Sequence, residues 1–294
     1  MMAQSPAYYN LGLTGGALGH SLSPKLHGAA LRSTGLAGEY RLYPIPPFPE
    51  GQAAMLALLN RLRSGELLGL NVTIPHKQNV IPFLDELTPA ARAIGAVNTI
   101  CVRRDNHLVG DNTDAAGFFS DLQRFAPFPS LPSSFIPEGP SSLILGAGGS
   151  AHAIVYALAQ AGWNVYVAAR RLEQAQALVA SLSTGKTMIT AIPLDAEAYS
   201  RQVSLVVNTT PVGMFPNSQA SPWPEATPFP TGAFIYDLVY NPAETQLVRA
   251  ARAAGLRAAN GLGMLIEQAI LGFEIWTGRR PSRQALWQAA AYSS

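Results

Sequence analysis

A long stretch without charge constrains the fold more than any other feature of this sequence. From Gly139 to Ala169 there is no Asp, Glu, Lys or Arg, and on length alone this stretch could span a lipid bilayer. It is interrupted by glycines and polar residues, however, and divides into two short apolar runs around a helical pattern. We therefore predict a buried strand, a turn, a helix and a second strand rather than a membrane span.

A glycine-rich turn joins the first of these strands to the helix. It consists of Gly146, Ala147, Gly148, Gly149 and Ser150, followed by Ala151, which is the G-x-G-x-x-A form of a dinucleotide fingerprint. Glycine permits the tight turn and close approach of a pyrophosphate, and the helix N-terminus offers free N–H groups to the phosphates. An ordinary glycine-rich turn is the alternative, but the strand, loop and helix context favours a cofactor site.

The end of the second strand indicates which dinucleotide would bind. An NAD site would carry Asp or Glu there to grip the ribose 2′-hydroxyl, whereas this chain has Ala169, Arg170 and Arg171. Two guanidinium groups suit the charge and geometry of a 2′-phosphate, and no carboxylate is present to repel it. The alternative is a pair of solvated arginines at a helix start, where they would oppose the helix dipole. We predict NADP(H).

Charge and cysteine content exclude several classes of function. The net charge is +2 and no basic run or stripe occurs, so nucleic acid and membrane surfaces are not expected partners. Cys101 is the only cysteine, which excludes an intrachain disulfide and a cysteine metal cluster, and no metal is predicted. No signal-peptide pattern is found near the N-terminus, so we expect a cytoplasmic protein.

Charged residues make up 13% of the chain, about half the ~25% usual for soluble domains. Lysine is especially rare, since only Lys25, Lys77 and Lys186 occur. We expect Lys25 and Lys186 to be surface residues. Lys77 lies just beyond a predicted strand that ends in Asn71 and Thr73, two side chains on one face of that strand, and we predict a functional role for it.

The pattern of elements indicates an α/β protein of two domains. The N-terminal part predicts strands at 8–14, 68–73 and 96–102, with helices at 24–34 and 53–64. A stretch rich in proline and serine, 126–142, predicts a surface loop or linker near a domain boundary. Strands then alternate with helices, which is typical of a Rossmann-like, doubly wound parallel sheet. We predict a substrate domain of 1–113 plus 261–294 and a cofactor domain of 114–260.

Other polar residues have two interpretations each. Ser21 and Ser23 precede or begin a predicted helix, where Ser23 is expected to act as a cap, although both hydroxyls together could bind an anion. Thr113 and Asp114 also precede a helix and could be caps. On the apolar helix 261–278, Gln268 needs a polar partner, which is either a backbone group or a ligand; Glu267 and Glu274 mark a wetter face of that helix.

Several ordered motifs together resemble the shikimate dehydrogenase family. They are Gly-x-x-x-x-His-Ser-x-Ser-Pro-x-x-His from Gly15, Asn-Val-Thr-x-Pro-x-Lys from Asn71, Gly-Ala-Val-Asn-Thr from Gly95, Gly-x-Asn-Thr-Asp-x-x-Gly-Phe from Gly110, the glycine loop, Asn-Thr-Thr-Pro-Val-Gly-Met from Asn208, Asp-Leu-Val-Tyr-Asn-Pro from Asp237, and Gly-Leu-Gly-Met-Leu from Gly261 with Gln268. The resemblance covers nearly the whole chain.

The resemblance implies NADPH-dependent reduction of 3-dehydroshikimate to shikimate, a small-molecule substrate of aromatic amino-acid biosynthesis. In the family, Lys77 and Asp114 match the catalytic pair, and Ser21 and Ser23 match the hydroxyls that hold the substrate carboxylate. The ring hydroxyls would be bound by Asn71, Thr73, Asn98, Asp114 and Gln268. Tyr240 matches a residue near the carboxylate, with simple aromatic packing as its alternative, and the backbone of Leu238 and Gly261 would lie near the nicotinamide.

The chain departs from the family pattern at a few positions. Gly28 stands where asparagine is usual, and Ala169 and Gln174 replace an asparagine and an arginine near the cofactor, so the grip on NADP would depend on Arg170 and Arg171. Two other functions remain alternatives. One is a quinate/shikimate dehydrogenase that uses NAD, and the other is a non-catalytic shikimate-binding paralogue. A monomer or a homodimer is expected.

Overall fold

The computed structural model describes residues 8–125, 139–182 and 187–291 of the chain. Most of the predicted linker and Lys186 lie outside these ranges. The chain forms two compact units, Met1–Gly117 with Ile266–Ser294 and Phe118–Leu265. The units divide inside helices α5 (Asp114–Leu122) and α10 (Leu262–Thr277), a few residues beyond the predicted domain boundaries. Both units are mixtures of helices and sheet, which confirms the α/β class.

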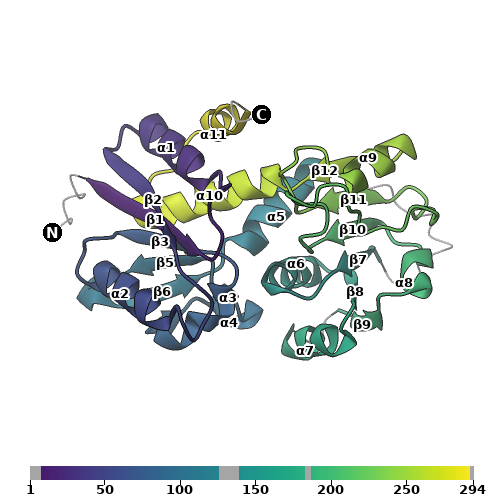
Figure 1. Ribbon diagram of the computed structural model, residues 1–294, viewed down its shortest axis with the longest axis horizontal. Coiled ribbons are helices and arrows are strands. Elements are labelled where there is room, and N and C mark those ends of the chain that lie inside the picture. Colours follow the sequence, from purple (N-terminus) through teal and green to yellow (C-terminus); the bar gives the residue numbers. More distant parts are fainter. Residues whose placement is uncertain (1–7, 126–138, 183–186, 292–294) are drawn as a thin grey trace. The chain divides into compact units, whose positions relative to one another are not determined.

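The first unit contains a mixed sheet of order β2-β1-β3-β5-β6-β4 (Figure 1). Its strands are β1 (Tyr9–Gly15), β2 (Gly38–Pro44), β3 (Gly69–Val72), β4 (Glu86–Leu87), β5 (Thr99–Val102) and β6 (Leu108–Asp111). Its further helices are α1 (Ser23–Thr34), α2 (Gln52–Arg63), α3 (His76–Asn79), α4 (Pro89–Ile94) and α11 (Arg283–Ala291). Strand β5 runs antiparallel to β3, and residues Asn71 and Thr99 lie directly opposite each other.

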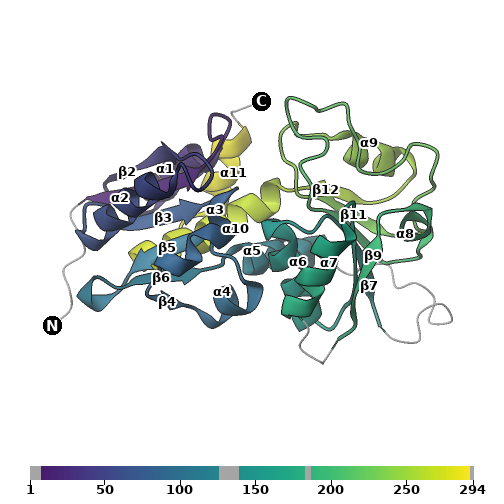
Figure 2. The same ribbon diagram turned by 60° about the horizontal axis from the view of Figure 1, so that its bottom comes forward.

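The two faces of this sheet differ in chemistry. Because side chains alternate along a strand, Leu70 and Val72 point to one face, where they form a core with Met55 and Leu59 of α2. Gly69 and Asn71 point to the other face, and Trp276 of α10 packs on Gly69. Figure 2 shows α2 and α10 on opposite faces. The polar face of β3 is therefore the one that α10 covers.

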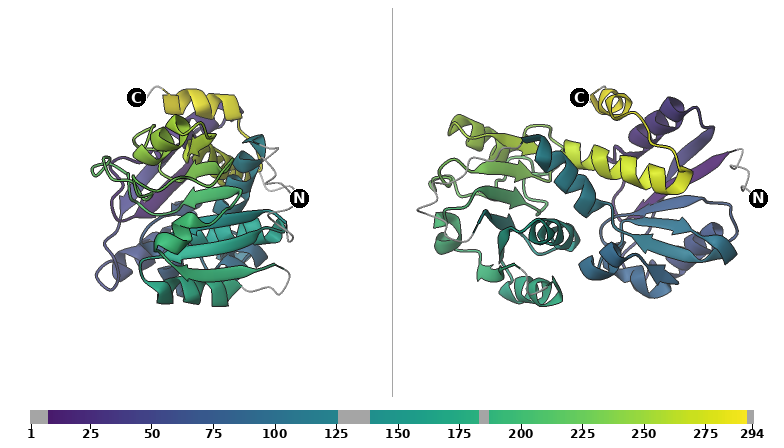
Figure 3. Two further views of the ribbon diagram at one scale, coloured as in Figure 1. Left: turned by 90° about the vertical axis from the view of Figure 1, so that its right-hand side faces the viewer. Right: turned by 180° about the vertical axis from the view of Figure 1, so that it is seen from behind.

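The second unit is a parallel sheet of order β12-β11-β10-β7-β8-β9, visible in the left view of Figure 3. Its strands are β7 (Ser141–Leu145), β8 (Asn164–Ala169), β9 (Ile189–Pro193), β10 (Leu205–Asn208), β11 (Phe234–Asp237) and β12 (Ala258–Asn260). The helices are α6 (Gly149–Gln160), α7 (Leu172–Leu182), α8 (Ala196–Ser200) and α9 (Gln246–Ala253). This is the strand order of the doubly wound dinucleotide-binding fold, whose direction of winding reverses between β7 and β10.

Two local predictions need correction. Ser141, assigned to the linker, begins strand β7 and is buried, because the sheet supplies backbone partners for this strand on both sides. Residues 96–98 precede β5 rather than belonging to it. The charge-free stretch forms β7, α6 and β8, as predicted. Within the described ranges, no helix combines the length and hydropathy that crossing a membrane requires.

A buried histidine lies under the polar face of the first sheet. His27 of α1 is 1% exposed, and its ring stacks parallel to that of Tyr40 on β2, with centroids 4.2 Å apart. Phe273 and Trp276 of α10 complete the aromatic surroundings. Neither ring nitrogen has a hydrogen-bond partner among the residues that the structure describes. Burial lowers the pKa of His27 to about 3, against a smaller opposing effect of Asn71.

This histidine should make the protein less stable in acid. Below pH 6.5 the unfolded chain takes up a proton on His27, which the folded chain does not bind until about pH 3. The free energy of unfolding should therefore fall by about 1.4 kcal/mol per pH unit, or about 2 kcal/mol between pH 6.5 and 5. Urea unfolding of the wild type and His27→Gln at pH 7.5 and 5.0 measures this loss, which the variant should lack.

The exposed His107 offers a matched control. His107→Gln removes an exposed imidazole instead of a buried one, so it should show the same pH dependence of the free energy of unfolding as the wild type. If the free energy of unfolding of His27→Gln fell with pH as steeply as that of the wild type, His27 would not be the cause of the acid destabilisation.

Candidate active site

Lys77 and Asp114 form a shielded ion pair in the first unit. The Nζ of Lys77 donates to Oδ2 of Asp114 at 2.6 Å, and the side chains are only 11% and 7% exposed. Lys77 lies on the short helix α3, which is anchored by its neighbour His76, whose Nε2 bonds to the Ile45 carbonyl at 2.9 Å. The backbone N–H of Val97 also bonds to the carbonyl of Lys77. The position of the ammonium group is thus fixed from several elements.

The carboxylate of Asp114 has a second partner and is not a helix cap. Its Oδ1 accepts from Nδ2 of Asn98 at 2.8 Å. The cap of α5 is Asn112, whose Oδ1 accepts from the N–H groups of Asp114 and Ala115. The alternative in which Asp114 or Thr113 caps this helix is therefore wrong. Because Asn112 satisfies the helix N-terminus, both Asp114 oxygens are available to Lys77 and Asn98.

Asn98 connects this pair to helix α10. Its Oδ1 accepts from the N–H of Thr113 at 2.8 Å, and its Nδ2 also lies 3.5 Å from Oε1 of Gln268. Gln268 is buried, and a Cβ at Gly117 of α5 would lie 2.7 Å from its backbone nitrogen, so glycine is needed for this close approach. The structure thus brings together four of the predicted residues, which are Lys77, Asp114, Asn98 and Gln268.

Asn71 belongs to the same polar face but has more protein partners than predicted. Its Oδ1 accepts from the hydroxyl of Tyr40 at 2.7 Å, and its Nδ2 donates to the Asn98 carbonyl and to Oγ1 of Thr99. Tyr40 and Thr99 were absent from the predicted site. A strand pattern alone gives no signal for Tyr40, whereas Thr99 adjoins a predicted site residue.

The hydroxyls near α1 are arranged differently from the prediction. Oγ of Ser21 accepts from the N–H of Ser23, while Leu22 holds the cap position of α1. The predicted capping by Ser23 is therefore wrong, since Ser21 satisfies that N–H group. No acidic residue lies in the first turn of α1, so this helix end suits an anion. Thr73 lies beside Gly15, where a Cβ would be 2.4 Å from its methyl group.

The glycine loop of the second unit lies at the reversal of strand order between β7 and β10. Gly146 has φ of +109°, and a Cβ there would lie 2.7 Å from Oγ1 of Thr209, which bonds to the Leu145 carbonyl. A Cβ at Gly148 would meet nothing within 4 Å, so the backbone is open to a ligand. No side chain caps α6, and its first turn has no acid. These features fit a diphosphate.

Arg170 and Arg171 follow the end of β8, both exposed. Within the part of the chain that the structure describes, their guanidinium groups form no hydrogen bond or ion pair. An unpaired cationic pair at this strand end fits a phosphate on an adenosine ribose.

Buried Asp237 shapes the loop after β11. It bonds to Asn208, to the N–H of Val239 and to Thr245, and burial raises its pKa. This loop carries Leu238 and Tyr240. A Cβ at Gly261 would lie 2.0 Å from the Leu238 carbonyl, so these two predicted cofactor residues are in close contact. The substrate contact of Tyr240 stays a prediction.

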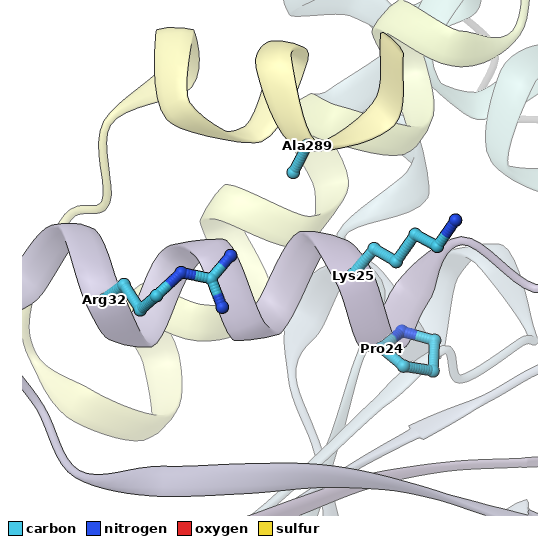
Figure 4. Close-up of a pocket in the computed structure, with 4 residues that line it drawn as sticks. All are labelled: Pro24, Lys25, Arg32 and Ala289. Atoms are coloured by element: carbon cyan, nitrogen blue, oxygen red, sulfur yellow. The ribbon is translucent and has the colours of Figure 1, made fainter. Parts of the chain in front are cut away.

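Lys25 is not among the residues that surround the Lys77–Asp114 pair. It is exposed on α1, where with Pro24, Arg32 and Ala289 it lines a surface pocket of about 340 Å³ (Figure 4). Its predicted surface position is confirmed.

Comparison with known proteins identifies the family. The model of the shikimate dehydrogenase substrate binding domain matches residues 13–100, and that of the shikimate 5′-dehydrogenase C-terminal domain matches residues 261–291. The shikimate dehydrogenase (NADP(+)) of Salinibacter ruber is 40% identical over 284 residues, covering 94% of this chain and 95% of that protein. The chain belongs to the shikimate dehydrogenase family. The family predicted from the motifs is thereby confirmed.

Two solved structures of similar proteins share the fold of the chain. The shikimate 5-dehydrogenase of Thermus thermophilus, in complex with NADP(H) and shikimate, is 35% identical with a TM-score of 0.82, covering 97% of this chain and 100% of that chain. The quinate dehydrogenase of Corynebacterium glutamicum, in complex with NAD, is 30% identical with a TM-score of 0.85, covering 97% and 99%. The same fold is thus found in complexes with NADP(H) and with NAD.

Proposed function

We propose that this protein is an NADP-dependent shikimate dehydrogenase, which reversibly reduces 3-dehydroshikimate to shikimate in chorismate and aromatic amino-acid biosynthesis. The observation that carries the proposal is the Lys77–Asp114 pair, 2.6 Å apart and surrounded by amide and hydroxyl groups. A polyhydroxylated ketone needs many short donors and acceptors beside one acid–base group. The named relative and the family models support the same activity.

Three groups of residues would bind three different parts of the cofactor. The loop from Gly146 to Ser150 would hold the diphosphate, Arg170 and Arg171 the 2′-phosphate, and the backbone of Leu238 and Gly261 the nicotinamide end. Bound NADPH supplies the hydride that reduces the ketone carbon. The open backbone at Gly148 and the uncapped N-terminus of α6 fit this ligand.

The substrate residues lie on the polar face of the first sheet and at the start of α1. The hydroxyls of Ser21 and Ser23 would bind the carboxylate, assisted by the positive end of the α1 dipole. Asn71, Thr73, Asn98 and Gln268 would bind ring hydroxyls. Such a site discriminates strongly against analogues without those hydroxyls, because its own buried polar groups would then lack partners.

Lys77 is the proposed acid–base residue. As the ketone is reduced, negative charge grows on its oxygen; the ammonium group stabilises this charge and gives up a proton to form the hydroxyl. In the reverse direction the neutral amine accepts that proton. Asp114 holds the ammonium through Oδ2, and its Oδ1 is fixed by Asn98.

Removing this group should abolish turnover more than binding. Lys77→Ala should lower kcat for shikimate oxidation by roughly 10²–10⁴-fold, the usual contribution of a positioned acid or base, with little change in KM. Initial rates of NADP⁺ reduction measure both constants. Lys25→Ala, which removes an exposed lysine, is the matched control and should behave as the wild type. Near-normal turnover by Lys77→Ala would refute the assignment.

Quinate/shikimate dehydrogenase activity with NAD is the second candidate function. It is favoured by the similarity to the quinate dehydrogenase in complex with NAD. The absence of an acid at Ala169 and the unpaired Arg170 and Arg171 oppose it, because this site lacks the carboxylate that would grip a ribose 2′-hydroxyl.

Cofactor preference should depend on these two arginines. The double variant Arg170→Ala/Arg171→Ala should raise KM for NADP⁺ by roughly 10–100-fold, because charge-assisted hydrogen bonds to the 2′-phosphate are lost. KM for NAD⁺ should change by less than about twofold, since NAD lacks that phosphate. Assays with both cofactors and with shikimate and quinate measure this. Exposed Arg279→Ala is the control. A preference of the wild type for NAD⁺ with quinate would favour the second function.

A further inference from the structure

Thr99 occupies a central position between two side chains of the proposed site. It is the first residue of β5 and is fully buried. Its Oγ1 accepts from Nδ2 of Asn71 at 3.2 Å and donates to Oδ1 of Asn98 at 3.0 Å. The antiparallel pairing of β3 with β5 sets Asn71 directly opposite Thr99, so this contact is a consequence of the strand register.

The Thr99 hydroxyl completes a continuous series of hydrogen bonds. The series runs from the Tyr40 hydroxyl to Asn71, from Asn71 to Thr99, from Thr99 to Asn98, and from Asn98 to the carboxylate of Asp114. The Thr99 hydroxyl lies between an N–H group of the Asn71 amide and the carbonyl oxygen of the Asn98 amide. Only a group that both accepts and donates can join these two, and a hydroxyl does both.

This series determines which atom each amide presents. Asn71 uses both N–H groups within the protein, on Asn98 and Thr99, so only its Oδ1 has capacity left. Oδ1 of Asn98 is held by Thr113 and Thr99, which turns its Nδ2 toward Asp114. Both N–H groups of Asn98 are thereby used within the protein, on Asp114 and on Oγ1 of Thr113. Asn71 is set as an acceptor, and Asn98 as the donor that holds Asp114.

Water has no access to replace the Thr99 hydroxyl. Thr99 is 0% exposed and Asn71 is 5% exposed. The backbone of α10 covers them, since a Cβ at Gly272 would lie 3.6 Å from both Nδ2 of Asn71 and Oγ1 of Thr99. A buried amide N–H that loses its partner stays unsatisfied or rotates to find another.

We propose that Thr99 is a positioning residue, whose hydroxyl fixes the amide of Asn71 in the orientation that binds a ring hydroxyl of the substrate and the amide of Asn98 in the orientation that holds Asp114. Through Asn98 it also orients the Asp114 carboxylate that holds Lys77. This inference rests on the proposed function. Thr99 acts on the substrate only through these neighbours.

Two variants of nearly equal size separate the hydroxyl from the packing. Thr99→Val keeps the shape and removes the hydroxyl, whereas Thr99→Ser keeps the hydroxyl and removes a methyl group. For Thr99→Val we expect KM for shikimate to rise about tenfold, as for the loss of one buried hydrogen bond, with a smaller fall in kcat. KM for NADP⁺ should not change. Thr99→Ser should stay within about twofold of the wild type.

A double-variant comparison distinguishes this role from a merely structural one. In an Asn71→Ala background, Thr99→Val should raise KM for shikimate by much less than tenfold, because one of the amides on which the hydroxyl acts is gone. A structural defect would instead multiply with Asn71→Ala. Thr99→Ala is a second hydroxyl-free variant if Thr99→Val does not fold, as judged by circular dichroism.

The possible failures are distinguishable. A wild-type protein that does not reduce NADP⁺ with shikimate would overturn the proposed function and this inference together. An active wild type with an unchanged KM in Thr99→Val would overturn only the role of Thr99. A Thr99→Ser variant as impaired as Thr99→Val, or additive effects with Asn71→Ala, would likewise overturn it.

Discussion

The shielded ion pair of Lys77 and Asp114 is the interaction on which the proposed site depends. Two charges that are nearly removed from water are stable only if they are paired and if their remaining hydrogen-bonding capacity is used. The surroundings meet this condition. Asn98 donates a hydrogen bond to the second oxygen of the Asp114 carboxylate, and Asn112 caps the N-terminus of α5. His76 anchors the short helix α3 that carries Lys77. The neighbouring residues can therefore be understood as consequences of keeping this pair charged.

The two sheets position different parts of the proposed site. The parallel sheet of the second unit places the open backbone of Gly148 and the uncapped helix α6 at the reversal of strand order, where ligands of doubly wound sheets bind. The mixed sheet of the first unit uses its antiparallel strand β5 to set Asn71 opposite Thr99. Its α10 face carries the polar network, and its α2 face carries an apolar core. Because side chains alternate along a strand, β3 contributes Leu70 and Val72 to the apolar core and Asn71 to the polar network.

Much of this organisation could be predicted from local patterns. The charge-free stretch predicted β7, α6 and β8 because the turn glycines and apolar runs act over a few residues. The motifs predicted the family, which the comparisons confirmed. The wrong predictions are of two kinds. In one, a side chain pairs with a residue that is distant in sequence; in the other, a neighbouring residue makes the expected helix cap instead. Glu267, expected on a wet helix face, is 4% exposed because Arg283 of α11 pairs with it at 2.5 Å. Ser23 and Asp114 were weighed as caps, but Ser21 and Asn112 satisfy those N–H groups.

The sequence by itself determined the α/β class, the glycine loop and the lack of an acid at the end of β8. These depend on residue type and short spacing, which local physical chemistry governs. The candidate pair of Lys77 and Asp114, 37 positions apart, came from the resemblance to the family. Only the tertiary structure decided that Tyr40 and Thr99 orient Asn71, that Asn98 holds Asp114, and that His27 is buried against Tyr40, its ring nitrogens without a hydrogen-bond partner among the described residues. Such contacts join strands and helices through the register and packing of the sheet, and a linear pattern carries no information about which distant side chain will lie opposite.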